Sequence, residues 1–254
     1  MKNQTGRFAM LSVLLFAAGC GLDDEYVEAL PQADTDGHVL EGGGIAENPP
    51  AFVSGVVPVS ASGYRYDRSR AAEYVEKYAL DSNPAFPVCG SLLHNSEADC
   101  TDFASQVLWY AGLPSDRRGS AWSGWWSNGR GCDDMNSSRS WRRVNDLLYY
   151  LVVESRRGEI VRDPAKLQVG DLIFYGLREP VADRNGRISY VCPAGEPFNH
   201  TTVVSAFEAP GKPLVSYHTR NALHVPYLAV HPDSRVRTGL GNACRMVMVH
   251  IRDR

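Results

Sequence analysis

Hydrophobic periodicity changes its character along the chain, from helical spacing before residue 153 to strand-like runs from residue 172 onward. Apolar residues recur at helical spacing over Ser69–Leu80, in a segment that begins at Cys100, and over Ser140–Val153. Short β-type runs then follow, separated by Gly, Pro and Asp: Leu172–Tyr175, Thr201–Phe207, Leu214–Tyr217 and Met246–Ile251. Helices first and strands later predict an α+β fold, in which the helices pack on an antiparallel sheet.

Residues at the boundaries support the first two predicted helices. Asp67 is placed to cap the first helix, and Asn83-Pro84 ends it. Cys100 falls in the first turn of the second helix, and Gly112 is a typical stop after its last apolar residue.

The N-terminus has the pattern of an export signal. Lys2 and Arg7 precede an apolar run over residues 8–18, which is too short to span a bilayer. The run ends in Ala17-Ala18-Gly19-Cys20, which resembles a bacterial lipobox with Ala17 in place of the commoner Leu. The resemblance implies lipid on Cys20, cleavage before it, and a protein anchored to the bacterial cell envelope. A plain signal peptide is the alternative.

Charge is distributed unevenly and divides the chain into three parts. Residues 21–60 carry eight acids and no Lys or Arg, whereas the whole chain has a formal charge of −3. With Gly42-Gly43-Gly44 and Pro49-Pro50, this stretch is predicted to be a flexible tether between the signal (residues 1–20) and a globular domain (residues 61–254). The balance of acidic and basic residues leaves no basic surface to bind nucleic-acid phosphates, so we expect no nucleic-acid partner.

Cys100 is the candidate nucleophile. The N–H groups and the dipole at a helix N-terminus stabilise a thiolate, so its pKa is predicted to be lowered. His200 opens a predicted strand and is the candidate base, and a hairpin near residue 210 returns the chain through His218. If the turn centres at residue 210, His218 shares a face with His200 and orients it; a shift by one residue favours Asn221 instead.

Five blocks of sequence lie in order over roughly residues 64–230: Tyr66–Pro87, Asp99–Gln106, Leu167–Tyr175, Asn199–Val204 and Ser216–Thr219. Together they resemble the bacterial putative amidase domain family, in the papain-like NlpC/P60 clan. The resemblance implies a papain-like fold and a catalytic triad of Cys100, His200 and His218. Asp102 and Asn199 depart from the family pattern, which leaves the substrate preference open.

Two further residues are candidates for substrate binding. The resemblance implies that Asp99 binds a substrate amine; from the residues alone, a helix cap is the alternative. Trp125 lies with Trp122 and Trp126 in a Gly/Ser-rich loop, where it could form a cleft wall for a sugar or peptide. Packing in the core beneath the loop is the other interpretation.

The cysteine count predicts two disulfides. Of six cysteines, a lipidated Cys20 and a catalytic Cys100 leave Cys89, Cys132, Cys192 and Cys244. Three pairings are possible, and proximity in sequence favours Cys89–Cys132 and Cys192–Cys244; buried free thiols are the alternative. The sequence has no CxxC, HExxH or EF-hand motif and no phosphate-binding Gly loop, so we expect no metal and no cofactor.

These features predict a monomeric, exported cysteine hydrolase that cuts an amide bond through a thioester. Cell-wall peptidoglycan is the expected substrate, because an envelope-tethered enzyme meets that polymer first. A non-catalytic module that binds peptide or glycan, and a thioester-based acyltransferase, are the alternatives.

Overall fold

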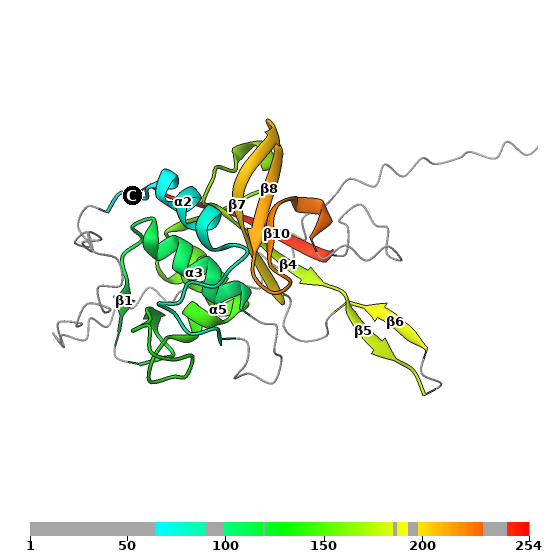
Figure 1. Ribbon diagram of the computed structural model, residues 1–254, viewed down its shortest axis with the longest axis horizontal. Coiled ribbons are helices and arrows are strands. Elements are labelled where there is room, and N and C mark those ends of the chain that lie inside the picture. The colour runs from blue at the N-terminus through cyan, green and yellow to red at the C-terminus, as the bar shows by residue number, and fades with distance from the viewer. Residues whose placement is uncertain are drawn as a thin grey trace, which may run out of the picture.

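The computed structural model describes residues 64–89, 99–118, 120–184, 187–192, 198–230 and 243–253. Helices gather on one side of a central sheet, and a two-stranded hairpin projects away from the body (Figure 1). The predicted signal, the predicted lipidation site Cys20 and the predicted tether lie outside the described residues. Within the described part, no helix has the length and apolar character that crossing a membrane requires.

The first two helices form as their boundary residues predict. Helix α2 (Arg68–Tyr78) begins after Asp67, whose side chain accepts hydrogen bonds from the N–H groups of Ser69 and Arg70. Helix α3 (Cys100–Tyr110) ends before Gly112, which adopts a φ of +97°. All residues of α3 from Cys100 to Leu108 are buried, so this helix lies inside the domain.

The third predicted helix is broken into three pieces. These are α4 (Arg139–Arg142), α5 (Val144–Tyr149) and a π-helical turn η2 (Tyr150–Glu154). The break falls at Arg143, whose backbone is extended with φ −119° and ψ 133°. The continuous apolar periodicity over Ser140–Val153 gave no sign of this interruption.

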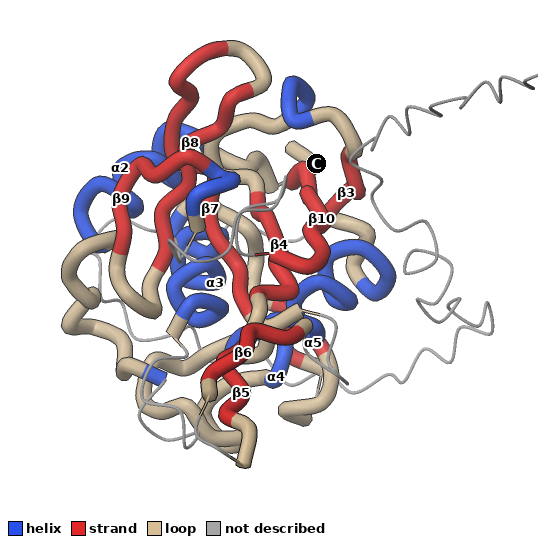
Figure 2. Tube along the Cα trace, turned by 90° about the vertical axis from the view of Figure 1, so that its right-hand side faces the viewer, coloured by secondary structure: helices blue, strands red, loops and turns tan. Residues whose placement is uncertain are grey.

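The central sheet has six antiparallel strands in the order β3-β10-β4-β7-β8-β9 within the described residues (Figure 2). The α+β prediction is therefore confirmed. The four predicted runs form four of the strands, and β3 and β9 complete the sheet. Its strands are β3 (Gly158–Val161), β4 (Leu172–Leu177), β7 (His200–Ala209), β8 (Lys212–Tyr217), β9 (Ala222–Pro226) and β10 (Ala243–Ile251).

Short elements connect and flank these layers. Two small two-stranded sheets pair β1 with β2 and β5 with β6, and single 3₁₀ turns precede β4 and follow β9. Their bounds are β1 (Asp116–Arg117), β2 (Gly124–Trp125), β5 (Glu179–Ala182), β6 (Ile188–Val191), η3 (Pro164–Lys166) and η4 (Tyr227–Ala229).

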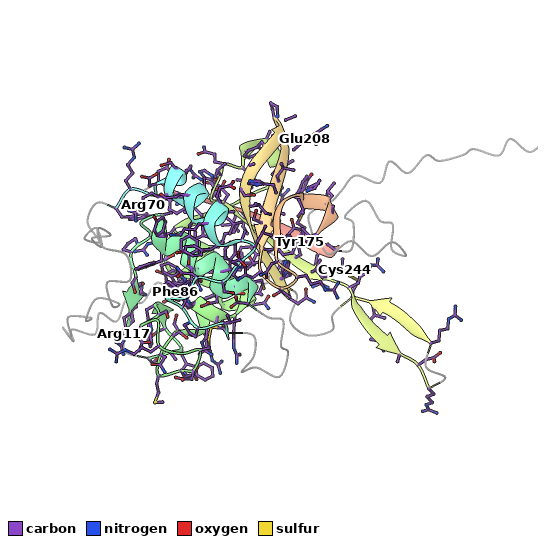
Figure 3. The ribbon with its side chains drawn as sticks, in the orientation of Figure 1. Arg70, Phe86, Arg117, Tyr175, Glu208 and Cys244 are labelled. Carbon is purple, nitrogen blue, oxygen red and sulfur yellow. A yellow bond between two sulfur atoms is a disulfide. The ribbon has the colours of Figure 1, made fainter. Side chains whose placement is uncertain are left out.

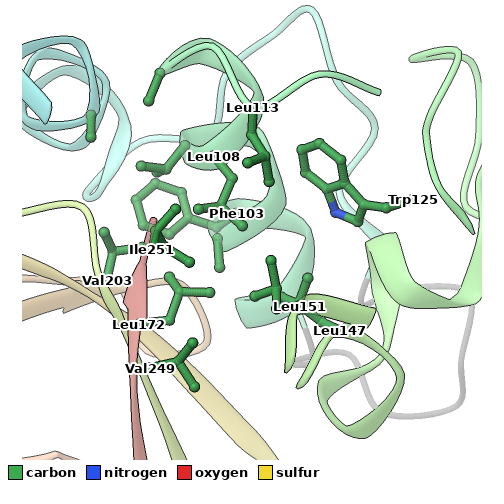
Figure 4. Close-up of a cluster of buried hydrophobic side chains, with 14 of the residues drawn as sticks. Phe103, Leu108, Leu113, Trp125, Leu147, Leu151, Leu172, Val203, Val249 and Ile251 are labelled. Atoms are coloured by element: carbon green, nitrogen blue, oxygen red, sulfur yellow. The ribbon is translucent and has the colours of Figure 1, made fainter. Parts of the chain in front are cut away.

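Each face of the sheet has its own hydrophobic cluster, because alternate residues of a strand point to opposite faces. On the helix face, Phe103 and Leu108 of α3 meet strand residues such as Leu172 and Val203 (Figure 4). On the opposite face, Ile173 and Tyr175 belong to a second cluster with residues of β8 and β10. A strand residue's cluster therefore tells which side of the sheet it faces.

A buried carboxylate fastens α2 to the sheet. Asp171, which is fully buried just before β4, accepts hydrogen bonds from Arg68 at 2.8 Å, from His250 at 2.9 Å and from the backbone N–H groups of Gln168 and Ile251. Arg68 also donates to backbone carbonyls of Val169 and Ile251. Asp171, just before β4, thus links helix α2 to strands β4 and β10.

The β5–β6 hairpin projects from the domain and is pinned at its base. Cys192 follows β6 directly and forms a disulfide with Cys244 of β10. Figure 3 places Cys244 where the hairpin meets the body, and Tyr175 nearby in the sheet. Because a lone two-stranded ribbon is only marginally stable in water, this cross-link fixes its attachment to the sheet.

Candidate active site

Cys100 is a buried free thiol at the first position of α3. Its exposed fraction is 3%, and it is the free cysteine that the described part of the chain contains. Cys89–Cys132 and Cys192–Cys244 are joined, which confirms the predicted disulfide pairing. Cys20 lies outside the described residues. The disulfides therefore leave one described thiol for chemistry.

The protonation of Cys100 differs from the prediction. Burial raises the pKa of the Cys100 thiol, and hydrogen bonds from the backbone of Thr201 and from the Thr101 side chain lower it by less; the nearby charge of Asp99 raises it further. The predicted lowering by the helix N-terminus was therefore wrong in direction. A buried thiol of this kind needs a base before it can act as a nucleophile.

Asp99 precedes Cys100, but its side chain does not cap the helix. One carboxylate oxygen accepts the backbone N–H of Cys89 at 3.1 Å, and the other lies 2.7 Å from His218 Nδ1. The Asp99 backbone N–H donates to the hydroxyl of Thr219 at 3.1 Å. The helix-cap interpretation is therefore wrong. A substrate amine, the other predicted partner, would have to bind a carboxylate that already contacts Cys89 and His218.

His218 has a defined partner at each ring nitrogen. Besides Nδ1 and Asp99, its Nε2 lies 2.7 Å from the backbone carbonyl of Tyr78, and its ring stacks on Phe103 of α3 at 4.2 Å between centroids. A carbonyl only accepts, so Nε2 carries a proton. With both ring nitrogens hydrogen-bonded within the protein, neither is placed to take the proton of the Cys100 thiol in this geometry.

His200 faces the opposite side of the sheet from His218. The β7–β8 hairpin closes through Pro210-Gly211, because Ala209 pairs with Lys212. Two further register shifts, between Phe207 and Ala209 and between Val204 and Ala206, then bring Val203 opposite Ser216. Continuing the observed pair Val203–Ser216 toward the site sets Thr201, and not His200, opposite His218.

Ring contacts agree with this register. The His200 ring meets that of Tyr217 edge-on at 4.9 Å between centroids, and lies 6.4 Å from Tyr175; both tyrosines belong to the cluster on the far face. The predicted hydrogen bond from His218 to His200 is therefore wrong. Asn221, the alternative, donates to the carbonyl of Leu80.

Trp125 lies in the core and not in a cleft wall. It is fully buried, its ring lies 4.9 Å from that of Trp141, and its indole N–H donates to Ser105 at 3.0 Å. The substrate-binding interpretation of Trp125 is corrected accordingly. Trp122 of the same loop has 69% of its surface exposed, with the Arg139 guanidinium over its ring.

A buried polar network behind the thiol was missed from sequence. Asp102 accepts hydrogen bonds from Gln106 and from the indole N–H of Trp141, and Gln106 accepts one from Tyr74. Burial, and then the charge of Asp99, raise the pKa of Asp102 well above its usual value. The i, i+4 spacing of Asp102 and Gln106 was the one available signal.

One group of metal-ligand atoms occurs among the described residues. Atoms of Cys89, Asp99 and Asp102 lie within 4.8 Å of one another. The Cys89 sulfur is in a disulfide, which removes the thiolate that a metal would need. The two carboxylates that remain are already hydrogen-bonded within the protein.

The family model named putative amidase domain matches residues 65–239, which is more than half of the chain. The chain belongs to this amidase family. Its match includes Cys100, His200 and His218 and ends before β10. The predicted membership of the family is thus confirmed, whereas the NlpC/P60 clan and the lipoprotein signal stay predictions.

A curated relative of this amidase domain is an uncharacterised protein of Bacillus subtilis (strain 168), YhbB. The two are 29% identical over 188 residues, covering 69% of this chain and 52% of the relative. The chain therefore spans about half the length of that protein. No solved structure matches the chain.

Proposed function

We propose that this amidase-domain protein is an exported cysteine hydrolase that cleaves an amide bond in cell-wall peptidoglycan. The observation that supports it most is the environment of Cys100: a free, buried thiol at the N-terminus of α3, hydrogen-bonded by the backbone of Thr201. The lipobox-like sequence before Cys20 supports the envelope location and hence the choice of polymer. A papain-like fold fits the order of a nucleophile helix followed by an antiparallel sheet.

His200 is the proposed base. It directly precedes Thr201, whose backbone contacts the sulfur, so its own backbone lies beside the thiol. His218 is less suited, because its nitrogens hold Asp99 and the Tyr78 carbonyl. The His200 ring packs against Tyr217 on the far face of the sheet, so a side-chain rotation alone does not reach the sulfur. We propose that the backbone at the start of β7 moves when substrate binds and brings the ring to the sulfur, since catalytic hydrogen bonds often tighten only in the complex.

The proposed reaction has two steps, formation of a thioester and its hydrolysis. His200 takes the thiol proton, the sulfur attacks the carbonyl carbon, and the carbon–nitrogen bond breaks as His200 returns the proton to the leaving amine. Water, deprotonated by His200, hydrolyses the thioester and releases a carboxylic acid and the thiol. Because the Asp99 side chain points away from the first turn of α3, the N–H groups there are not used by a cap and can stabilise the oxyanion.

The test is a digest of peptidoglycan fragments by the full chain in detergent, with products weighed by mass spectrometry. We expect the wild type to produce fragments that have gained one water at a cleaved amide. Cys100→Ala and His200→Ala should not produce them. Glu208→Gln, a control at the exposed tip of the β7–β8 hairpin, should produce them as the wild type does (Figure 3). Transfer to an added amine would indicate an acyltransferase. Binding without any product, in wild type and Cys100→Ala alike, would contradict the proposal and favour a binding module.

A further inference from the structure

The turn between β8 and β9 is strained at a β-branched residue. Tyr217 pairs with Ala222, and the two central residues of the turn, Thr219 and Arg220, have φ values of +70° and +64°. Positive φ at both central positions is typical of a type I′ turn, which favours Asn and Gly. A non-glycine residue held there is strained, and threonine, which is β-branched, is among the residues least suited to it.

The strained residue is hydrogen-bonded to the backbone next to the thiol. Thr219 Oγ1 accepts the Asp99 N–H at 3.1 Å, and its neighbour His218 holds the Asp99 carboxylate at 2.7 Å. Asn221, on the other side of the turn, donates to the Leu80 carbonyl at 3.0 Å, just after α2. The turn therefore joins the end of α2 to the start of α3.

Asp99 is consequently fixed at each of its polar groups. Its N–H is bonded to Thr219, its carboxylate to Cys89 and His218, and its carbonyl accepts the N–H of Phe103 as the first bond of α3. The Asp99–Cys100 peptide carries the N–H of Cys100 and sets the direction of its side chain. Holding Asp99 therefore holds the backbone from which the Cys100 side chain extends.

We propose that Thr219 is a positioning residue for Cys100, whose left-handed backbone is retained because its hydroxyl holds the Asp99 peptide. This deepens the proposed function and rests on Cys100 being its nucleophile. Glycine would relieve the strain but has no hydroxyl, whereas serine supplies one in the same conformation. Substitution by glycine is thus expected to relieve the backbone strain of the turn and to loosen the positioning of Cys100.

Arg220 provides a matched control within the same turn. It has nearly the same positive φ as Thr219, and its side chain is exposed. Arg220→Gly relieves comparable strain without touching Asp99. If the turn matters only for the hairpin, Thr219→Gly and Arg220→Gly should behave alike.

The experiment compares Thr219→Gly, Thr219→Ser and Arg220→Gly in the full chain. Four quantities are measured: the rate at which iodoacetamide alkylates Cys100, located by peptide mass spectrometry; the thermal unfolding midpoint; and kcat and KM on peptidoglycan fragments. For Thr219→Gly we expect alkylation to rise about tenfold as the peptide loosens, and kcat to fall about ten- to a hundredfold with KM within about twofold. Its unfolding midpoint should not fall.

Arg220→Gly and Thr219→Ser should both stay within about twofold of wild type in alkylation and in kcat. The inference is overturned if Thr219→Gly matches Arg220→Gly in the alkylation rate, if serine fails to restore it, or if Thr219→Gly lowers the unfolding midpoint. Should the wild type cleave nothing, the proposed function fails, but the alkylation comparison still decides the role of Thr219.

Discussion

At the scale of single residues, the site departs most from what local sequence indicates. A helix N-terminus stabilises a thiolate, but Cys100 is buried so completely that the opposite effect on its pKa is larger. Asp99 likewise has the sequence position of a cap, yet its carboxylate is drawn to Cys89 and His218. Burial and long-range partners decide both cases, and neither can be read from neighbours in sequence.

Asp99→Asn tests how this carboxylate affects the thiol. The amide can keep each hydrogen bond, with its oxygen accepting from Cys89 and its NH₂ group donating to His218 Nδ1, while Nε2–H still donates to Tyr78. The charge of Asp99 raises the pKa of Cys100, so its removal should lower that pKa. We expect the pH profile of Cys100 alkylation by iodoacetamide to move toward lower pH, with Glu208→Gln unchanged. A profile that stays in place, or moves upward, would rule this out.

Asp102→Asn tests the buried network. The pKa of Asp102 is raised in the folded protein, so the folded state holds its proton more tightly than the unfolded chain does. Stability from this group is present below the unfolded pKa of about 3.9 and is lost as pH rises through the folded pKa. The free energy of unfolding of Asp102→Asn, measured with urea, should therefore increase relative to that of wild type as pH rises from about 4 to 7.

Asp133 gives a control of opposite sign. Hydrogen bonds from Asn136 lower the pKa of this exposed carboxyl, so its stabilisation is present above its unfolded pKa and lost as pH falls. Asp133→Asn should lose stability relative to wild type as pH rises toward the unfolded pKa of about 3.9, and should show no gain on wild type over the range used for Asp102. The same trend in both variants would show that the interpretation of Asp102 is wrong.

At the scale of elements, the sequence predicted where helices and strands lie better than how they meet. Helices α2 and α3 and four central strands follow from periodicity and from residues such as Asp67 and Gly112. The break at Arg143 was missed because no Gly or Pro marks it. Which sheet faces His200 and His218 occupy could not be predicted, because the pairing at the site depends on the length of the β7–β8 turn and on two register shifts along the two strands.

The two disulfides link different elements and allow a matched comparison. Cys89–Cys132 holds the backbone N–H that donates to Asp99, whereas Cys192–Cys244 pins the projecting hairpin. They span 43 and 52 residues, so their removal should cost similar stability, about 2–4 kcal/mol each. We expect Cys89→Ser with Cys132→Ser to lower kcat on peptidoglycan fragments about tenfold or more.

Cys192→Ser with Cys244→Ser is the control, and it should lose stability without a comparable loss of kcat. Chemical unfolding gives the stability of both pairs, and the activity assay is run where each variant is fully folded. Equal losses of kcat in the two pairs would mean that the first disulfide acts on the site only through overall stability.

At the scale of the whole molecule, the Asp171 cluster joins helix α2 to strand β10. Arg68 of α2 and His250 of β10 both bond to this buried carboxylate. The sequence located Asp171 within a family block but did not indicate its partners, which lie about 80 and 100 residues away. Only the closed fold brings them together.

His250→Gln tests the cluster through pH. The hydrogen bond to Asp171 raises the pKa of His250, and partial burial lowers it by less. A raised histidine pKa adds stability that is complete below the unfolded value of about 6.5 and is lost as pH rises through the folded value. The wild-type free energy of unfolding, measured with urea, should exceed that of His250→Gln by the largest amount at about pH 5.5 and by the smallest at about pH 8.5. A difference that grows with pH would contradict this role.

The pinned hairpin has a consequence for how chains of this family can diverge. Pairing between β5 and β6 is self-contained, and the Cys192–Cys244 bond fixes where the chain returns to the body. Residues can therefore be inserted or deleted between Asp183 and Arg187 without changing the register of β4 or β7. Homologues can vary in length at this tip while their sheets still superimpose, and an epitope grafted there would be displayed on a hairpin that projects from the body (Figure 1).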